Sequence, residues 1–125
     1  MMLLATACGG ALGAALRYLT VHWAARLFGT GFPYGTLAVN VAGSLVMGLL
    51  AAWFVQRGSG PSPLAAFAMT GVLGGFTTFS AFSLDALLLY EEGRMLAAAG
   101  YVGLSVAASI GALFAGIAMA RTVLA

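Results

Sequence analysis

Residues 70–85 read T-G-V-L-G-G-F-T-T-F-S-A-F-S-L-D and lie inside an apolar run that extends from residue 64 to residue 90. A run of this length can cross a lipid bilayer as a helix, which takes about 20 apolar residues. Its centre holds two consecutive glycines followed by two threonines and a serine, residue types that weaken a helix and bring hydroxyl groups. Irregular backbone survives at membrane depth only where it is buried in protein or lines a watery cavity. The pattern therefore predicts a transmembrane span broken near residues 74–78, with a site there for an ion or a small polar solute.

The composition of the whole chain indicates an integral membrane protein. The 125 residues are 62% hydrophobic and 6% charged, with a mean hydropathy of +1.06. Soluble domains carry about 25% charged residues, so water is excluded as the main solvent. The net charge of +2 comes from five arginines and three acids, without any lysine. This charge is too sparse for a nucleic-acid-binding surface, and no nucleic acid partner is expected.

Four segments are apolar and long enough to span the bilayer. We therefore expect an all-α fold with four transmembrane helices in a single membrane domain, residues 1–125. The predicted spans are residues 3–25, 34–55, 64–90 and 95–120. Turns rich in glycine and proline at residues 29–33 and 57–63 separate the first three, and a charged turn at residues 91–94 precedes the fourth. No segment is left for a soluble domain, so function is expected inside the membrane.

The only cysteine lies in the first span, where it bears on whether this helix is retained. The residues before Cys8 read L-A-T-A and resemble a lipoprotein cleavage site, but the basic stretch that begins a signal peptide is missing. We therefore expect a retained first helix. With one cysteine, no intrachain disulfide can form.

Small residues recur at helical spacing and predict close packing between helices. Three pairs stand four positions apart: Gly9 and Gly13, Gly71 and Gly75, Ala112 and Gly116. Such positions let helix backbones approach closely in lipid. Because one thin bundle offers more of these faces than it can use, self-association is expected, most simply as a two-fold dimer. In the alternative interpretation, the small residues only pack the monomer.

The arginines give no preferred orientation. Cytoplasmic loops normally carry the excess of basic residues. Here Arg57 and Arg121 fall on one side of the predicted membrane, and Arg26 and Arg94 on the other. This balance suggests that the chain inserts in both orientations, which would produce an antiparallel dimer whose function is symmetric about the midplane.

Polar and aromatic residues at membrane depth form stripes on three of the predicted spans. The stripes are Thr36, Asn40 and Ser44 on the second span, Phe79 and Phe82 on the third, and Tyr101, Ser105 and Ser109 on the fourth. Membrane Ser and Thr often bond to their own backbone, Asn often joins two helices, and Phe often only packs. In the functional interpretation, hydroxyls, an amide NH₂ and the positive edges of aromatic rings together favour an anion.

One arginine is embedded in the first span. A buried arginine in a membrane is a functional hypothesis by default, and Arg17 could attract anions towards a water-filled vestibule. A structural pair with Asp85 is the alternative. The single histidine, His22, lies near the end of the same span, where an interfacial role is expected. The sequence shows no Cys/His cluster, phosphate-binding loop or Ser-His-Asp set, so we do not expect an enzyme.

Three motifs resemble those of the Fluc (CrcB-type) fluoride channel family. They read G-G-A-L-G-A-A-L-R-Y at residues 9–18, G-T-L-A-V-N-V-A-G-S at 35–44, and G-V-L-G-G-F-T-T-F-S-A-F at 71–82. They occur in the family's order on a chain of the right size, and the likeness covers all four spans. Two positions differ from the common pattern, since Ala81 stands where threonine is usual and Asp85 where glutamate is frequent.

The resemblance implies a passive, fluoride-selective channel in the cell (inner) membrane that exports fluoride and protects the cell from its toxicity. It also implies an antiparallel, dual-topology homodimer with two pores and a central structural sodium ion, bound by the main-chain carbonyls of Gly74 and Thr77. The residues implied for the fluoride path are the pair Phe79 and Phe82, the amide of Asn40, and a polar track of Ser80, Tyr101, Ser105 and Ser109 with Thr36 nearby. Arg17 corresponds to the family's vestibule arginine.

Two other functions fit part of the pattern. A proton-coupled exporter of small cations can also be a four-span, dual-topology protein. It needs a carboxylate in the first helix, where this chain has Arg17, and the only embedded acid is Asp85. A non-transporting assembly subunit would use its polar stripes to bind partner helices.

Overall fold

The computed structural model describes residues 1–124, and every regular element in this part of the chain is a helix. In chain order the elements are α1 (Met2–Phe28), α2 (Tyr34–Gln56), α3 (Pro63–Ala65), the π-helix η1 (Ala66–Leu73), α4 (Gly74–Phe76), α5 (Ser80–Glu91) and α6 (Met95–Leu124). Within residues 1–124, four stretches are apolar and long enough to cross a membrane: α1, α2, α6 and the composite span Pro63–Glu91. The predicted all-α architecture with four long apolar helices is confirmed, and it indicates a multi-pass membrane protein.

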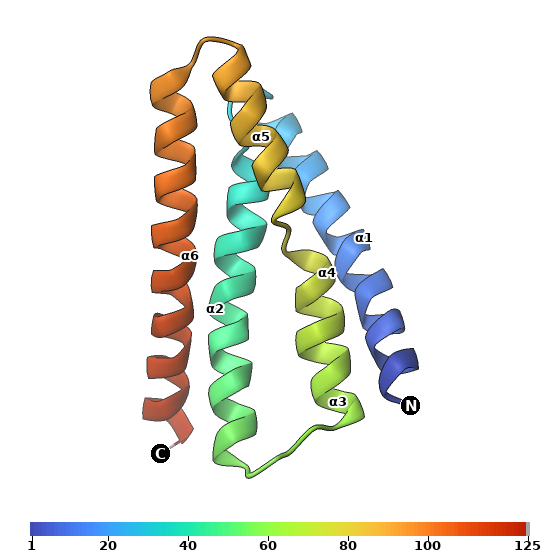
Figure 1. Cartoon of the computed structure of the whole chain (residues 1–125). Coiled ribbons are helices and arrows are strands. Elements are labelled where there is room, and N and C mark those ends of the chain that lie inside the picture. Colours follow the sequence, from blue (N-terminus) through green and yellow to red (C-terminus); the bar gives the residue numbers. More distant parts are fainter. Residues whose placement is uncertain (125) are drawn as a thin grey trace.

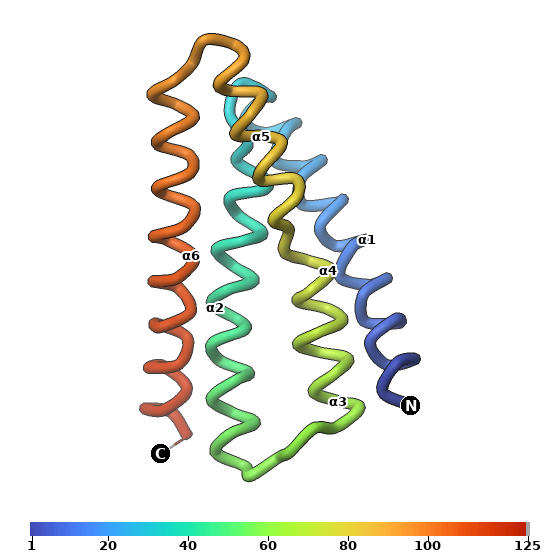
Figure 2. Tube along the Cα trace, viewed as in Figure 1, coloured from blue at the N-terminus to red at the C-terminus, as the bar shows by residue number. Residues whose placement is uncertain are grey.

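The helices form two side-by-side pairs (Figures 1 and 2). α2 packs mainly on α6, whereas α1 packs along η1 and α4. α5 contacts α6, so the third span starts in one pair and ends against the other. The N-terminus, the loop after α2 and the last turns of α6 lie at one end of the bundle. The α1–α2 and α5–α6 turns lie at the opposite end.

Glycines allow the close approach of helices within each pair. A Cβ atom on Gly13 of α1 would overlap the carbonyl oxygen of Val72 in η1. Gly48 of α2 and Gly116 of α6 face each other's helix backbone in the same way. The small residues that the sequence offered for self-association are therefore used inside one chain. They support the alternative interpretation, packing of the monomer, and give no separate indication of a dimer.

Turn chemistry explains where the spans begin and end. Gly29 ends α1 with a positive φ of 79°, a conformation that side chains other than glycine rarely adopt, and its N–H donates to the Ala25 carbonyl. At the next span, the Ser62 hydroxyl accepts a hydrogen bond of 3.2 Å from the N–H of Ala65, and Pro63 is the first helical residue. A capping serine followed by proline is a strong helix start.

The third span is not a continuous α-helix. Its residues 66–73 form a π-helix, a wider form that is rare and short in most proteins. The helix then ends at Phe76, Thr77 is extended (φ −83°, ψ 160°), and α5 begins at Ser80. Gly74 and Gly75 are themselves helical, so the non-helical segment, residues 77–79, follows the two glycines. No pattern in residues 66–73 indicates a π-helix.

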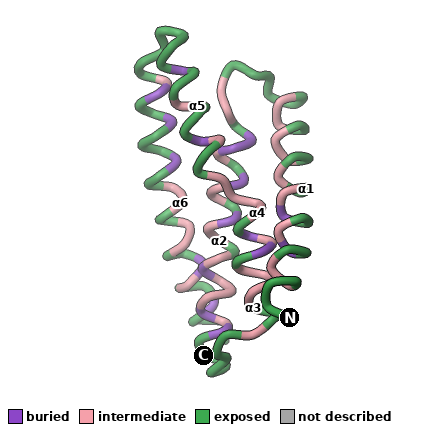
Figure 3. The backbone as a smooth tube through the Cα atoms, turned by 45° about the vertical axis from the view of Figure 1, so that its right-hand side comes forward, coloured by how far each residue is buried: buried purple, intermediate pink, exposed green. Residues whose placement is uncertain are grey.

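Burial is confined to the inner faces of the helices (Figure 3). Large apolar side chains point outwards, among them Leu96, which is 90% exposed, and Val123, which is 80% exposed. Exposed apolar side chains on every long helix fit a lipid environment, because lipid tails are as apolar as leucine.

Candidate functional site

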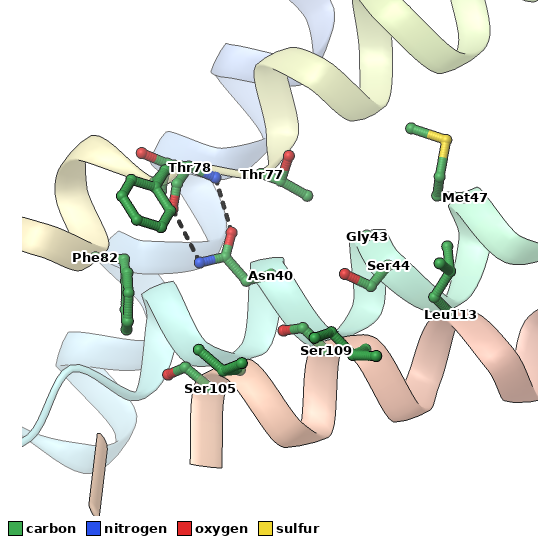
Figure 4. A pocket seen from close by; sticks show the side chains of 13 residues that line it. Asn40, Gly43, Ser44, Met47, Thr77, Thr78, Phe82, Ser105, Ser109 and Leu113 are labelled. Atoms are coloured by element: carbon green, nitrogen blue, oxygen red, sulfur yellow. Dashed lines mark hydrogen bonds between the residues drawn. The ribbon is translucent and has the colours of Figure 1, made fainter. Parts of the chain in front are cut away.

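A cavity of about 420 Å³ lies between α2, α6, the segment 77–79 and the start of α5 (Figure 4). Six polar residues contribute to its lining: Asn40, Ser44, Thr77, Thr78, Ser105 and Ser109. Phe79 and Phe82 also line it, and Met47 and Leu113 line its apolar end. An amide and several hydroxyls therefore share one cavity with two aromatic rings, inside helices that are otherwise apolar.

Asn40 holds the non-helical segment to α2. Its Nδ2 donates a hydrogen bond of 3.0 Å to the carbonyl of Thr78, and its Oδ1 accepts one of 2.7 Å from the N–H of Thr78. The side-chain amide thus satisfies both backbone groups of this residue, as a neighbouring strand would. Nδ2 carries a second hydrogen, and no residue in the described chain accepts it.

The two threonines of the segment end one helix and begin the next. Thr77 Oγ1 donates to the Leu73 carbonyl at 2.8 Å, and the N–H of Thr77 reaches the same oxygen at 3.0 Å. Thr78 Oγ1 accepts from the N–H of Ala81 at 3.1 Å, which caps the first turn of α5. Gly43 makes room for this arrangement, because a Cβ atom there would overlap the methyl group of Thr77.

Aromatic rings continue from the cavity towards the α1–α2 turn. The centroids of Phe79 and Phe82 are 5.6 Å apart, and those of Phe82 and Tyr101 are 5.2 Å apart. Phe32 meets Tyr101 edge to face at 5.4 Å. Phe82 is buried, whereas Phe79 is 78% exposed in the single chain. Tilted rings of this kind present positively polarised edges as well as faces.

Ser105 and Ser109 are unusual because both hydroxyl groups are buried and neither has a hydrogen-bond partner within residues 1–124. A buried polar group without a partner costs about 1–3 kcal/mol, and such groups in native proteins call for an explanation such as an unseen water or ion. Because both serines line the cavity, a polar occupant of the cavity would satisfy them.

A second, smaller cavity of about 220 Å³ lies at the end of the bundle that holds the α1–α2 turn. Its lining includes Thr36, Asp85 and Glu92. Tyr101, which is fully buried, donates a hydrogen bond of 3.0 Å from its hydroxyl to Asp85 Oδ2. Because the Phe82 ring packs on Tyr101, aromatic side chains stand between the two cavities.

Arg17 does not pair with Asp85. Its Nε donates a hydrogen bond of 3.0 Å to the carbonyl of Gly75, at the C-terminal end of α4. Asp85 is bound by Tyr101 instead, so the interpretation of Arg17 and Asp85 as an ion pair is wrong. In the part of the chain that the structure describes, the one ion pair joins Arg94 to Glu92 at 3.8 Å.

Two main-chain carbonyls at the end of α4 have the character of cation ligands. The carbonyls of Gly74 and Thr77 accept no hydrogen bond from residues 1–124, because the donors that would continue the helix are diverted to Asn40 and Thr78. Gly74 is exposed, and a Cβ atom there would meet only the Met69 carbonyl oxygen, at an ordinary contact distance of 3.8 Å. The described chain holds no cluster of His, Cys, Asp or Glu for a metal. Freed carbonyls at a half-helix C-terminus are typical sodium ligands in membrane proteins.

The structure brings together part of the residue set expected for the fluoride path. Asn40, Phe79, Phe82, Ser105 and Ser109 line the larger cavity. Thr36 lines the smaller one, and Tyr101 lies between the two, bound to Asp85. Ser80 is exposed and reaches only the Thr78 hydroxyl, at 3.4 Å.

Two polar residues of the cavity, Ser44 and Thr78, are not among the residues expected for the fluoride path. The four-residue spacing from Asn40 is the signal that indicates Ser44. For Thr78 the sequence offers only a hydroxyl. The backbone contact of Thr78 with Asn40 joins residues 38 positions apart, and no local pattern indicates it.

The fold and the site together define a class: a small, multi-pass helical membrane protein with a polar cavity beside an interrupted helix. Within this class, the chain belongs to the CrcB family, because the model of that family, "CrcB-like protein, Camphor Resistance (CrcB)", matches residues 4–117. The family resemblance predicted from the three motifs is confirmed.

Relatives named as channels match the chain along nearly its full length. The "Fluoride-specific ion channel FluC" of Cereibacter sphaeroides is 56% identical over 119 residues, covering 95% of this chain and 94% of the relative. "Fluoride-specific ion channel FluC 2" of Nitrobacter hamburgensis is 54% identical over 113 residues, covering 90% and 91%. The FluC protein of Rhodospirillum centenum is 52% identical over 124 residues, covering 99% and 98%.

Proposed function

We propose that this protein is a fluoride channel that lets fluoride leave the cytoplasm passively and so protects the cell. The observation that carries the proposal is the pair of buried, unpartnered hydroxyls of Ser105 and Ser109 in the cavity beside Asn40. The names of relatives more than 50% identical to the chain supply the ion.

The groups that face the cavity suit a small anion. Ser105 and Ser109 offer free O–H donors, and Asn40 offers the Nδ2 hydrogen that Thr78 does not use. α5 begins at Ser80 beside the cavity, and the N-terminal end of a helix carries a partial positive charge. Donors in a narrow path can replace the hydration shell of a small ion, which is how a channel selects one ion over a larger one.

No fuel is needed for export. Hydrogen fluoride crosses membranes as a neutral acid and ionises in a less acidic cytoplasm, which traps fluoride inside. An open path for the anion relieves the trap, because a membrane potential that is negative inside drives anions out at about 2.3 kcal/mol per charge and 100 mV. The chain itself then has only to bind the anion weakly and exclude competitors.

The dimer is part of the same proposal. The balanced arginines at the two ends support insertion in both orientations, and hence an antiparallel homodimer with two pores in the inner membrane. Phe79, which is 78% exposed, and Gly74, which is also exposed, offer surface at the interruption for a second copy. Within that dimer, the Gly74 and Thr77 carbonyls would bind a structural sodium ion. The positive charge of the ion would take the place of the N–H donors that these oxygens do not have.

The remaining predicted residues take roles at the ends of the path. Thr36 in the smaller cavity and Tyr101 between the two cavities would pass the anion onward, with Ser80 at the exposed start of α5. Arg17 would add a positive field near the vestibule while its guanidinium stays bound to the Gly75 carbonyl.

Fluoride efflux from liposomes tests the function. Purified protein is reconstituted into vesicles loaded with potassium fluoride, a potassium ionophore is added, and external fluoride is followed with a selective electrode. A fluoride flux that continues when a protonophore collapses any pH gradient is expected. A fluoride flux that requires the pH gradient would indicate proton-coupled transport and not a channel, and absence of fluoride flux would favour the exporter of small cations or the assembly subunit.

Replacing both orphan hydroxyls tests the site. Ser105→Ala with Ser109→Ala should lower the flux about tenfold or more, because a hydrogen bond to a charged group is worth about 1.5–3 kcal/mol. Ser83→Ala is the matched control, since its exposed hydroxyl bonds only the Phe79 carbonyl one turn back on α5. Equal flux through both variants would remove these serines from the path.

A further inference from the structure

The two ends of the bundle differ in whether acidic residues accompany their arginines. At the end with the α5–α6 turn, Arg94 bonds the Gly31 carbonyl and lies 3.8 Å from Glu92. All three acidic residues of the sequence belong to α5 or to this turn. At the opposite end, where α2 and α6 finish, Arg57 and Arg121 are exposed and form no ion pair within residues 1–124. This end therefore carries two cations without a countercharge from the described side chains.

An apolar groove of about 380 Å³ runs between the last turns of α2 and α6 at this end. Leu50 and Trp53 line it from α2, and Met119 and Val123 line it from α6. The helices are in close contact just before the groove, at Gly48 and Gly116, and the groove opens where larger side chains follow these glycines. Its shape and lining suit a hydrocarbon chain.

A fixed cation stands at the mouth of the groove. The guanidinium carbon of Arg57 lies 4.5 Å from the centroid of the Trp53 ring, within the range of a cation–π contact. Because Trp53 also lines the groove, this contact ties the charge to the apolar wall. Arg121 follows Ala120, another lining residue, in the last turn of α6. Arg57 therefore places its guanidinium beside the groove, and Arg121 adds a second positive charge in the last turn of the helix that forms the opposite wall.

We propose that this groove binds one anionic glycerophospholipid, with an acyl chain between α2 and α6 and the phosphate at Arg57, at the end of the bundle that also carries Arg121. Charge complementarity selects this occupant. A zwitterionic lipid would fill the groove equally well but would bring no net negative charge, because its headgroup cation cancels the charge of its phosphate. Basic pockets between transmembrane helices are known to bind acidic headgroups, and guanidinium groups bind phosphate in two-point geometry. In an antiparallel dimer, each leaflet would contain one such site.

Tryptophan quenching by brominated lipids tests the proposal. The chain has two tryptophans, so Trp23→Phe leaves Trp53 as the only reporter. The variant is reconstituted into phosphatidylcholine vesicles that contain an equal fraction of either brominated phosphatidylglycerol or brominated phosphatidylcholine. Trp53 should prefer the anionic lipid about five- to thirtyfold, since each arginine near an acidic lipid contributes roughly a fivefold factor.

Matched variants separate the site from general surface charge. In the Trp23→Phe background, Arg57→Gln with Arg121→Gln should reduce the preference to about one, whereas replacement of both arginines by lysine should keep most of it. Trp53→Phe leaves Trp23, whose ring lies 5.8 Å from the Arg26 guanidinium at the other end and does not line this groove. Its anionic preference should be clearly smaller.

Three results would overturn the proposal. The first is an unchanged preference in the double glutamine variant, and the second is an equal preference at Trp23. The third is the absence of quenching of Trp53 by either lipid, which would mean that a protein surface, such as a second copy of the chain, covers the groove.

Discussion

Asn40→Ala should destabilise the protein and remove its fluoride flux at the same time. The substitution deletes two hydrogen bonds, of 3.0 and 2.7 Å, that together hold both backbone groups of Thr78. Each orphaned backbone group costs about 1–3 kcal/mol when buried. Asn40 is half-buried beside a cavity that can admit water, so the lower end applies and the total loss should be about 2–3 kcal/mol.

Chemical unfolding in detergent measures the loss, with tryptophan fluorescence as the signal, and liposome efflux measures the flux. Ser44→Ala is the matched control. It removes a polar group one turn further along the same face of α2, lines the same cavity, and has no hydrogen bond to residues 1–124. Its stability should change by less than about 0.5 kcal/mol. If Asn40→Ala unfolds at the same denaturant concentration as the unmodified protein, the amide does not hold the segment.

Three further outcomes follow from the packing. Gly13→Ala should cost about 1–3 kcal/mol in unfolding measurements, because its methyl group meets the η1 backbone, whereas Gly10→Ala, with open space, should be neutral; equal effects would refute the contact. Gly43→Ala should lower the flux by pushing on the methyl group of Thr77, and a second change, Thr77→Ser, should restore flux because it removes that methyl and keeps the hydroxyl; a failed rescue would count against the steric account. Ser105→Ala should leave unfolding stability unchanged or slightly higher, since the lost hydroxyl has no partner, and a loss above about 1 kcal/mol would reveal an unrecognised bond.

Features that depend on local pattern could be predicted from the sequence. Apolar runs of spanning length gave the four helices, and the motif at residues 71–82 gave the family. Asn40, Phe82, Ser105 and Ser109 could be grouped because membrane depth and helical spacing place polar groups on the same faces. These inferences need only the period of a helix and the poor fit of polar groups to lipid.

Features that depend on which helices meet could not be predicted. The small-residue pairs predict close contact between helices. The pattern at Gly13 does not indicate whether the partner helix is η1 of the same chain or a helix of a second copy. The partner of Arg17 is a related case. Opposite charge left a pair with Asp85 open as an alternative, whereas the interruption of the third span frees a carbonyl at Gly75 that accepts from Nε. The π-helix likewise packs along α1, and its own residues carry no pattern that indicates it.

The interruption of the third span gives it two ends of opposite polarity within a few residues. α4 finishes at Phe76 and presents carbonyls, the negative end of a helix, while α5 starts at Ser80 and presents N–H groups, the positive end. Arg17 already donates to a carbonyl of the negative end, which leaves those of Gly74 and Thr77 for the proposed sodium ion. In an unbroken helix these carbonyl and N–H groups would bond to each other, and neither partial charge would be available to an ion. A protein with few charged residues can therefore attract a cation and an anion to neighbouring points by interrupting one helix, provided that a side chain such as Asn40 satisfies the backbone between them.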